Sequence, residues 1–222
     1  MQVRLLPILC LVFVLSACAG HRMALTKGQS DVDVSKKSIA LVSAKISNQY
    51  KPAFQLDIIT AYICPPSQED CSRARSYIHK ISSDYRTKRV TDSHNEYLLS
   101  FELESGAYNF DGMGAIYESV FITGGGVVPL KLKFQIGPNA VIYLGHLDIV
   151  MRERKNDSEM RAGRMTPLID QAVIGVSSGT FDVLVEDKFA QDQALFISEY
   201  PALQKVKIEK SLLPQWTRPK AD

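Results

Sequence analysis

The sequence predicts a mainly β protein, an antiparallel β-sandwich with one short helix near the C-terminus. Three observations support this fold class. Apolar and polar residues alternate with a period of two through several short segments. Turn-forming residues separate many of these segments, and helical periodicity is confined to one segment late in the chain. Many short strands joined by turns, with little helix, are typical of sandwich folds.

The chain begins with a short apolar block that follows one positive charge. Arg4 precedes an apolar run over residues 5–15, interrupted only by Pro7. A membrane-spanning helix needs about 20 apolar residues, so this run is too short to cross a bilayer. A charged start, a short apolar middle and a small-residue end form the layout of a secretory signal peptide. We therefore assign residues 1–17 to a cleaved signal peptide.

The apolar block ends in Leu-Ser-Ala-Cys at residues 15–18. This stretch resembles the lipobox of bacterial lipoproteins, in which a peptidase cuts before the cysteine. The resemblance implies that Cys18 becomes the first mature residue and carries lipid, and several acyl chains anchor a protein stably where one does not. In Gram-negative lipoproteins an aspartate after the cysteine causes retention at the inner membrane. Ala19 therefore implies the outer membrane, facing the periplasm. The alternative is a chance cysteine in an ordinary leader, which also contains Cys10.

Composition and patterning divide the mature chain into three parts. Residues 18–37 are polar and mixed in charge, so we expect the lipidated cysteine and a flexible tether there. Residues 38–210 contain the alternating segments and form the predicted sandwich domain, and residues 211–222 form a C-terminal tail. The formal net charge is +2, with 45% hydrophobic and 23% charged residues. These are ordinary globular values, and no clustered basic footprint argues for a nucleic-acid partner.

Two kinds of strand are expected. Residues 97–104, 131–136 and 180–186 alternate strictly and predict strands with one buried face. In the second of these, Leu132, Phe134 and Ile136 alternate with Lys131, Lys133 and Gln135. Residues 54–63 and 141–150 are more continuously apolar and predict strands buried more fully. The Gly-Pro-Asn sequence at residues 137–139 suits a tight hairpin.

One segment predicts a helix, and three others resemble a known architecture. Residues 187–198 have helical character, with Asp187 able to cap the start and Pro201 beyond the end. Residues 105–110, 131–136 and 139–147 resemble the prealbumin-like sandwich modules of exported bacterial proteins, where a glycine-tyrosine turn precedes a strand. This resemblance implies a sandwich in preference to a barrel.

Two cysteines remain in the mature chain besides Cys18. Cys64 and Cys71 are separated by Pro-Pro-Ser-Gln-Glu-Asp. Exported proteins fold in an oxidising compartment, so the pair predicts a disulfide. The chain-entropy model gives so short a loop about 2–3 kcal/mol of stabilisation. A metal site would need further ligands at a workable spacing, and none stand nearby. We expect neither a metal nor a cofactor.

One pair of residues raises the possibility of catalysis. His146 and Asp148 are two positions apart in a predicted strand, so they share a face and could act as a base and its orienting carboxylate. No G-x-S-x-G sequence marks a nucleophile. The sequence therefore favours a non-enzymatic binding or structural module, anchored by lipid, with an envelope protein or the cell wall as its partner. The alternative is an anchored hydrolase that uses His146, Asp148 and an unidentified serine.

Two further motifs are predicted to have no chemical role. Three glycines at residues 124–126 are not followed by Lys-Ser or Lys-Thr, so a phosphate loop is excluded and a flexible loop between strands is expected. Residues 152–164 contain five basic and three acidic residues. Interleaved charges weaken attraction to an anionic surface, so this segment is expected to be an exposed, solvated hairpin connection.

Overall fold

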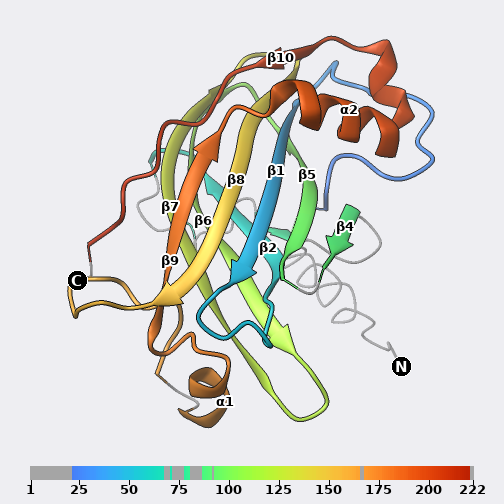
Figure 1. The fold of residues 1–222 in the computed structure, drawn as a ribbon. Helices are drawn as coiled ribbons and strands as arrows, with labels where there is room; N and C mark the ends of the chain where they lie inside the picture. Colours follow the sequence, from blue (N-terminus) through green and yellow to red (C-terminus); the bar gives the residue numbers. More distant parts are fainter. Residues whose placement is uncertain are drawn as a thin grey trace, which may run out of the picture.

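A computed structural model describes residues 22–67, 71, 78–80, 87–91, 93–165 and 168–220. The protein is mainly β, with two sheets and few helices (Figure 1). The larger sheet contains β1 (Ser38–Asn48), β4 (Thr87–Val90), β5 (Asn95–Leu103), β8 (Val141–Glu153), β9 (Gly179–Glu186) and β10 (Ile208–Lys210). The smaller sheet contains β2 (Asp57–Cys64), β3 (Ile78–Lys80), β6 (Gly106–Glu118) and β7 (Thr123–Ile136).

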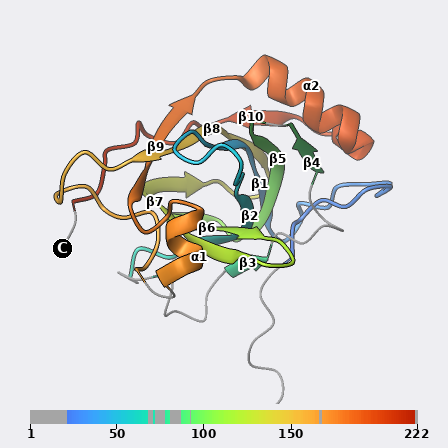
Figure 2. The same ribbon diagram turned by 60° about the horizontal axis from the view of Figure 1, so that its bottom comes forward.

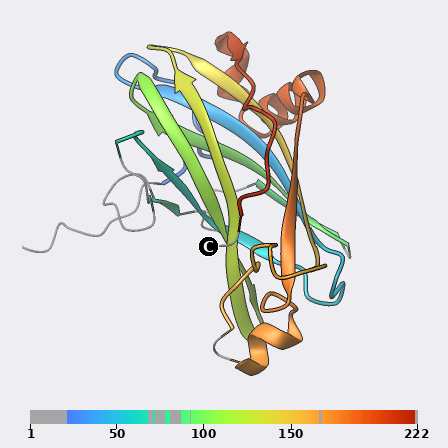
Figure 3. The same cartoon turned by 90° about the vertical axis from the view of Figure 1, so that its left-hand side faces the viewer.

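The two sheets form layers that face each other across one hydrophobic cluster (Figures 2 and 3). Its members come from both sheets and include Val42, Ile46, Leu99, Phe101, Leu147, Ile58, Ile63, Phe110, Leu132 and Phe134. The alternation predicted over residues 131–136 is confirmed, because the apolar side chains are buried and the polar ones are exposed. Burial of this apolar face is what drives the two sheets together.

The larger sheet is mixed, which corrects the prediction of an antiparallel fold. β1 pairs with β5 antiparallel but with β8 parallel, and β10 also pairs with β8 parallel. In the smaller sheet, every pair of described neighbouring strands is antiparallel. Period-two alternation is the same for both directions of pairing, so the sequence pattern could not distinguish them.

The turn at residues 137–139 does not form a hairpin, contrary to the prediction. It connects β7 in the smaller sheet to β8 in the larger sheet. Ser38 at the start of β1 holds this turn, because its hydroxyl donates to the Gly137 carbonyl at 2.6 Å and accepts from the Ala140 N–H at 3.1 Å. These bonds attach the end of the turn to the larger sheet, so the chain crosses between layers.

The predicted C-terminal helix is confirmed as α2 (Phe189–Glu199), which a 3-10 helix, η1 (Pro201–Lys205), follows. Figure 2 shows α2 on the outer face of the larger sheet. A second hydrophobic cluster lies beneath it and includes Leu25, Val32, Ile39, Leu41, Tyr143, Phe196, Tyr200 and Leu203. This cover explains why β8 is buried on both faces over much of its length. β2 is less buried than predicted, because half of its side chains are only partly buried.

Both ends of the domain are packed rather than free. Within the predicted tether, Met23, Leu25 and Val32 are buried and pack on the domain; residues 18–21 lie outside the described part. In the predicted tail Leu213 is buried, and the Trp216 indole N–H donates to the Pro129 carbonyl at 2.8 Å. Single apolar side chains without periodicity carry these contacts, and periodicity alone cannot reveal them.

The three glycines lie inside β7 and not in a loop, which corrects that prediction. The backbone at residues 162–163 packs directly on them, and Val127 N–H donates to the Ala162 carbonyl at 3.0 Å. A Cβ on Gly126 would collide with that carbonyl. Gly125 N–H donates to the Gln171 side chain at 3.2 Å, on the short helix α1 (Leu168–Val173). Glycine is needed in this strand because other backbone approaches it closely.

Candidate functional site

Four polar side chains meet beneath α2 on the outer face of the larger sheet. Ser43 comes from β1, Tyr143 and His146 from β8, and Asp192 from α2. Asp192 Oδ2 accepts hydrogen bonds from the hydroxyls of Ser43 and Tyr143, and Ser43 Oγ lies 2.8 Å from His146 Nδ1. Asp192 is only 2% exposed. We call these four residues the buried polar cluster.

A β-bulge brings Tyr143 and His146 to the same face of β8. The two residues are three positions apart, so regular alternation would point them to opposite faces. Leu41 on β1 pairs with Tyr143, but its successor Val42 pairs with Gly145, so β8 has one extra residue. Gly145 has φ +122, a conformation that favours glycine. The bulge therefore assembles the cluster.

The hydrogen bonds determine which atoms carry the protons. Ser43 has one hydroxyl proton and donates it to Asp192, so its oxygen accepts from His146 Nδ1–H. This assignment leaves Nε2 as the unprotonated nitrogen, and it has no hydrogen-bond partner. Burial and the positive charge of Lys188 lower the pKa of His146, while nearby carboxylates oppose this shift. Burial and the contact with Asp192 raise the pKa of Tyr143. The imidazole and the phenol are therefore neutral at pH 7.

A pocket of about 370 Å³ opens beside the buried polar cluster. Its floor comes from β1, β5 and β8, and one wall comes from α2. The lining residues are Ser43, Ala44, Lys45, His94, Glu96, Tyr97, Leu98, His146, Lys188, Gln191, Asp192, Leu195, Ser198 and Glu199. The lining contains both hydrogen-bond donors and acceptors, with Leu98 and Leu195 as apolar surfaces. Pockets of this size and mixed lining suit small polar molecules.

His146 and Asp148 share the outer face as predicted, but they are not hydrogen bonded to each other. Asp148 Oδ2 instead lies 2.8 Å from Lys45 Nζ, on the neighbouring strand. The carboxylate near His146 is Asp192, whose Oδ2 lies 3.9 Å from Nδ1. The serine and carboxylate that the sequence analysis missed left weak signals. Ser43 is a hydroxyl in the middle of an apolar strand, and Asp192 lies four residues before Phe196, on the apolar stripe of its helix.

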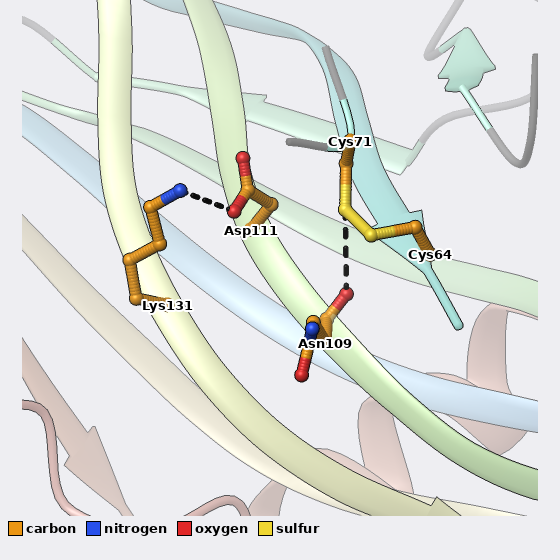
Figure 4. Close-up of a disulfide and its surroundings, with 5 residues drawn as sticks. All are labelled: Cys64, Cys71, Asn109, Asp111 and Lys131. Atoms are coloured by element: carbon orange, nitrogen blue, oxygen red, sulfur yellow. Dashed lines mark hydrogen bonds and ion pairs between the residues drawn. A yellow bond between two sulfur atoms is a disulfide. The ribbon is translucent and has the colours of Figure 1, made fainter. Parts of the chain in front are cut away.

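The disulfide predicted between Cys64 and Cys71 is confirmed, with the two Cα atoms 5.5 Å apart (Figure 4). Cys64 ends β2 and pairs with Asn109 of β6. Cys71 Sγ lies 4.0 Å from the Asn109 carbonyl oxygen. The bridge therefore fastens the chain after β2 to the smaller sheet.

Replacing both bridging cysteines, Cys64→Ala with Cys71→Ala, should lower the free energy of unfolding by about 2–3 kcal/mol, because the unfolded chain gains loop freedom. Denaturant unfolding of the double variant and the unchanged protein measures this loss. Mass spectrometry without reduction should show the two peptides linked. Alkylation of both thiols in unreduced, folded protein would show that no bridge forms.

The arginine-rich segment is held by internal ion pairs. Arg152 Nη2 lies 2.6 Å from Glu159 Oε1, and Arg152 Nε lies 2.6 Å from Asp182 Oδ2 on β9. The hydrogen bond from Arg152 lowers the pKa of Glu159 to about 2. The segment does connect β8 to β9, as predicted, but Glu159 is buried rather than solvated. These ion pairs hold the segment in place between β8 and β9.

The remaining candidates from the sequence are placed as follows. His94 lines the pocket, with Nε2 3.2 Å from Glu96 Oε1. Cys18 and His21 lie outside the described residues. His79 belongs to β3 by its backbone. In the described ranges, no group of three or more His, Cys, Asp or Glu residues is placed to hold a metal ion.

The chain matches no protein-family model, no curated protein and no solved structure. None of the helices in the described part of the chain is long and apolar enough to cross a membrane.

Proposed function

We propose that this protein is a lipid-anchored component of the bacterial cell envelope, held through Cys18 at the outer membrane and facing the periplasm. Its folded part acts as a non-enzymatic β-sandwich module that binds an envelope partner. The lipobox-like sequence supports the anchor. The pocket beside the buried polar cluster is the observation that carries the binding role.

The chemistry of the pocket favours a fragment of the cell-wall polymer as the ligand. Muropeptides combine hydroxyls, amides and carboxylates, so they need both donors and acceptors from a binding site. Lys45 and Lys188 bring cationic donors to the lining and Glu96 and Glu199 bring acceptors, and each of these side chains also contacts a partner within the protein. Leu195 offers an apolar surface for a sugar ring or methyl group. Most of the lining residues are polar or charged, which suits a ligand that carries many polar groups of its own.

A hydrolase is the second candidate, because Ser43 Oγ lies 2.8 Å from His146 Nδ1 beside a pocket. Acyl transfer also needs N–H donors aimed at the developing oxyanion. Ser43 pairs with Leu98 on one side and with His146 on the other, so the sheet engages the backbone N–H groups around it. Its hydroxyl proton is directed to Asp192 rather than to the imidazole. Labelling of Ser43 by a fluorophosphonate would favour the hydrolase over the binding module.

Cys18→Ser should abolish lipid attachment and leave an unprocessed or mislocalised precursor, because serine offers no thiol for the acyl group. Fractionation of cells with mass measurement of the protein tests this result. Cys10→Ser, in the same apolar leader, is the matched control and should leave anchoring unchanged. If the Cys18→Ser protein is cut from its signal peptide and still partitions with membranes, the anchor lies elsewhere.

Gln191→Trp should weaken muropeptide binding by at least about tenfold, equivalent to about 1.4 kcal/mol, because the indole fills the pocket. Gln191 is exposed and lines the pocket from α2. Ala194→Trp is the matched control, since Ala194 is exposed on the same helix but does not line the pocket. Calorimetric titration with purified muropeptides measures both. Equal affinity of the two variants would place the ligand outside the pocket.

A further inference from the structure

One ring nitrogen of His146 is buried without a hydrogen-bond partner. The residue as a whole is only 9% exposed, and the unpaired atom is Nε2. An unpaired buried polar atom costs free energy, so native structures contain few of them. His146 also lines the pocket beside the buried polar cluster. Its imidazole is therefore a part of the pocket wall where a ligand can supply the missing partner.

The other ring nitrogen determines the protonation of this one. Nδ1 lies 2.8 Å from Ser43 Oγ, and the Ser43 hydroxyl donates its one proton to Asp192. Tyr143 donates to the same carboxylate oxygen, so Asp192 acts as an acceptor towards both hydroxyls. Nδ1 must then carry the imidazole proton, which leaves a lone pair on Nε2. The chain of hydrogen bonds from Asp192 through Ser43 thus presents an acceptor at the pocket wall.

Charged side chains surround the imidazole on the elements that pack around it. They are Lys45 of β1, Asp148 of β8, Glu186 of β9, Lys188 before α2 and Asp192 within it. Asp148 and Glu186 are each paired with a lysine at 2.8 Å. Burial and the charge of Lys188 lower the pKa of His146 despite the carboxylates. The same burial and the same lysine disfavour an ammonium group at Nε2, so an uncharged donor suits it best.

We propose that His146 selects the ligand of the pocket by accepting a hydrogen bond at Nε2 from an amide N–H or a hydroxyl. This inference rests on the proposed binding of muropeptides, which carry both kinds of donor, and it names the group in them that the protein recognises. A carboxylate or ether oxygen in the same place would set two acceptors against each other. A site built around a hydrogen bond discriminates strongly against ligands that cannot form it.

Nitrogen NMR of protein with isotopically labelled histidine tests the proposal at pH 7.5, and the signals of His146 are identified by their loss in His146→Gln. In the free protein, His146 should have a proton on Nδ1 and none on Nε2. Saturation with purified muropeptides should move the Nε2 resonance towards that of a protonated nitrogen, because the donor shares its hydrogen with Nε2. A proton on Nε2 in the free protein, or an Nε2 resonance that bound muropeptide leaves unmoved, overturns the proposal.

The pH dependence of binding is a second readout, which a purely structural role of His146 would not move. Protonation turns Nε2 into a donor, so the affinity for muropeptides should fall by about tenfold for each pH unit below the pKa that the spectra give for His146. His146→Gln should remove this dependence. His94→Gln, which replaces another imidazole of the lining, should keep it. A constant or rising affinity in the unchanged protein as His146 gains its proton overturns the proposal.

Failure of the proposed function gives a different result. Calorimetry that detects no binding of muropeptides at any pH overturns the binding role, and the selection by His146 with it. Muropeptides that bind with Nε2 unmoved and with no dependence on the protonation of His146 leave the binding role intact and overturn only the recognition of a donor by this residue.

Discussion

Replacing Phe134 by alanine should lower the free energy of unfolding by about 3–5 kcal/mol, from lost transfer energy and the cavity left behind. Phe134 lies in β7 and points into the cluster between the sheets, beside Leu132 and Ile136. Its ring stacks on Tyr108 of β6 with the centroids 5.7 Å apart. The side chains of this cluster are held on strands, so the packing can close the gap left by the ring only in part.

Lys133→Ala is the matched control for this change. Lys133 is adjacent in the same strand but exposed, so its truncation should stay within about 0.5 kcal/mol. Denaturant unfolding of the domain without its lipid compares the two variants. Equal losses at both positions would contradict the assignment of Phe134 to the shared core.

Removing both hydroxyls that bind Asp192, by Ser43→Ala with Tyr143→Phe, should cost about 3–5 kcal/mol. Each hydroxyl donates to Asp192 Oδ2, and the carboxylate is almost fully buried beneath α2. Without these donors the buried carboxylate loses two hydrogen bonds that water cannot replace fully, which is the expensive part of the change. Adding Asp192→Asn should therefore recover part of the loss.

Ser47→Ala is the control for the loss of a buried serine. Ser47 is also buried on β1, but its hydroxyl has no hydrogen-bond partner, so its removal should be close to neutral. The comparison is made at pH 7.5. In the folded protein the pKa of His146 is lowered from its ordinary 6.5. As the pH falls through 6.5, the unfolded chain therefore binds a proton before the folded protein does, and the free energy of unfolding decreases. Above that value the imidazole is neutral in both states. A double variant as stable as Ser47→Ala would show that the Asp192 contacts contribute little.

Local chemistry made the strands, the disulfide and the late helix predictable. Leu132, Phe134 and Ile136 alternate with polar residues, and this alternation specifies a strand with one buried face wherever the strand is placed. Cys64 and Cys71 are close in the chain, so their pairing needed no knowledge of the fold. The apolar stripe of α2 likewise depends only on residues a few positions apart.

The sequence by itself determined the segments that are strands or helix and the faces they bury. Only the tertiary structure decided how those segments pair and which polar side chains meet. β1 lies between β5 and β8, with opposite directions of pairing on its two sides. Ser43, His146 and Asp192 are far apart in the chain, and an extra residue beside Gly145 turns Tyr143 to the same face. Contacts of this kind depend on the register between strands, and a one-residue change in register reverses the face of every residue beyond it.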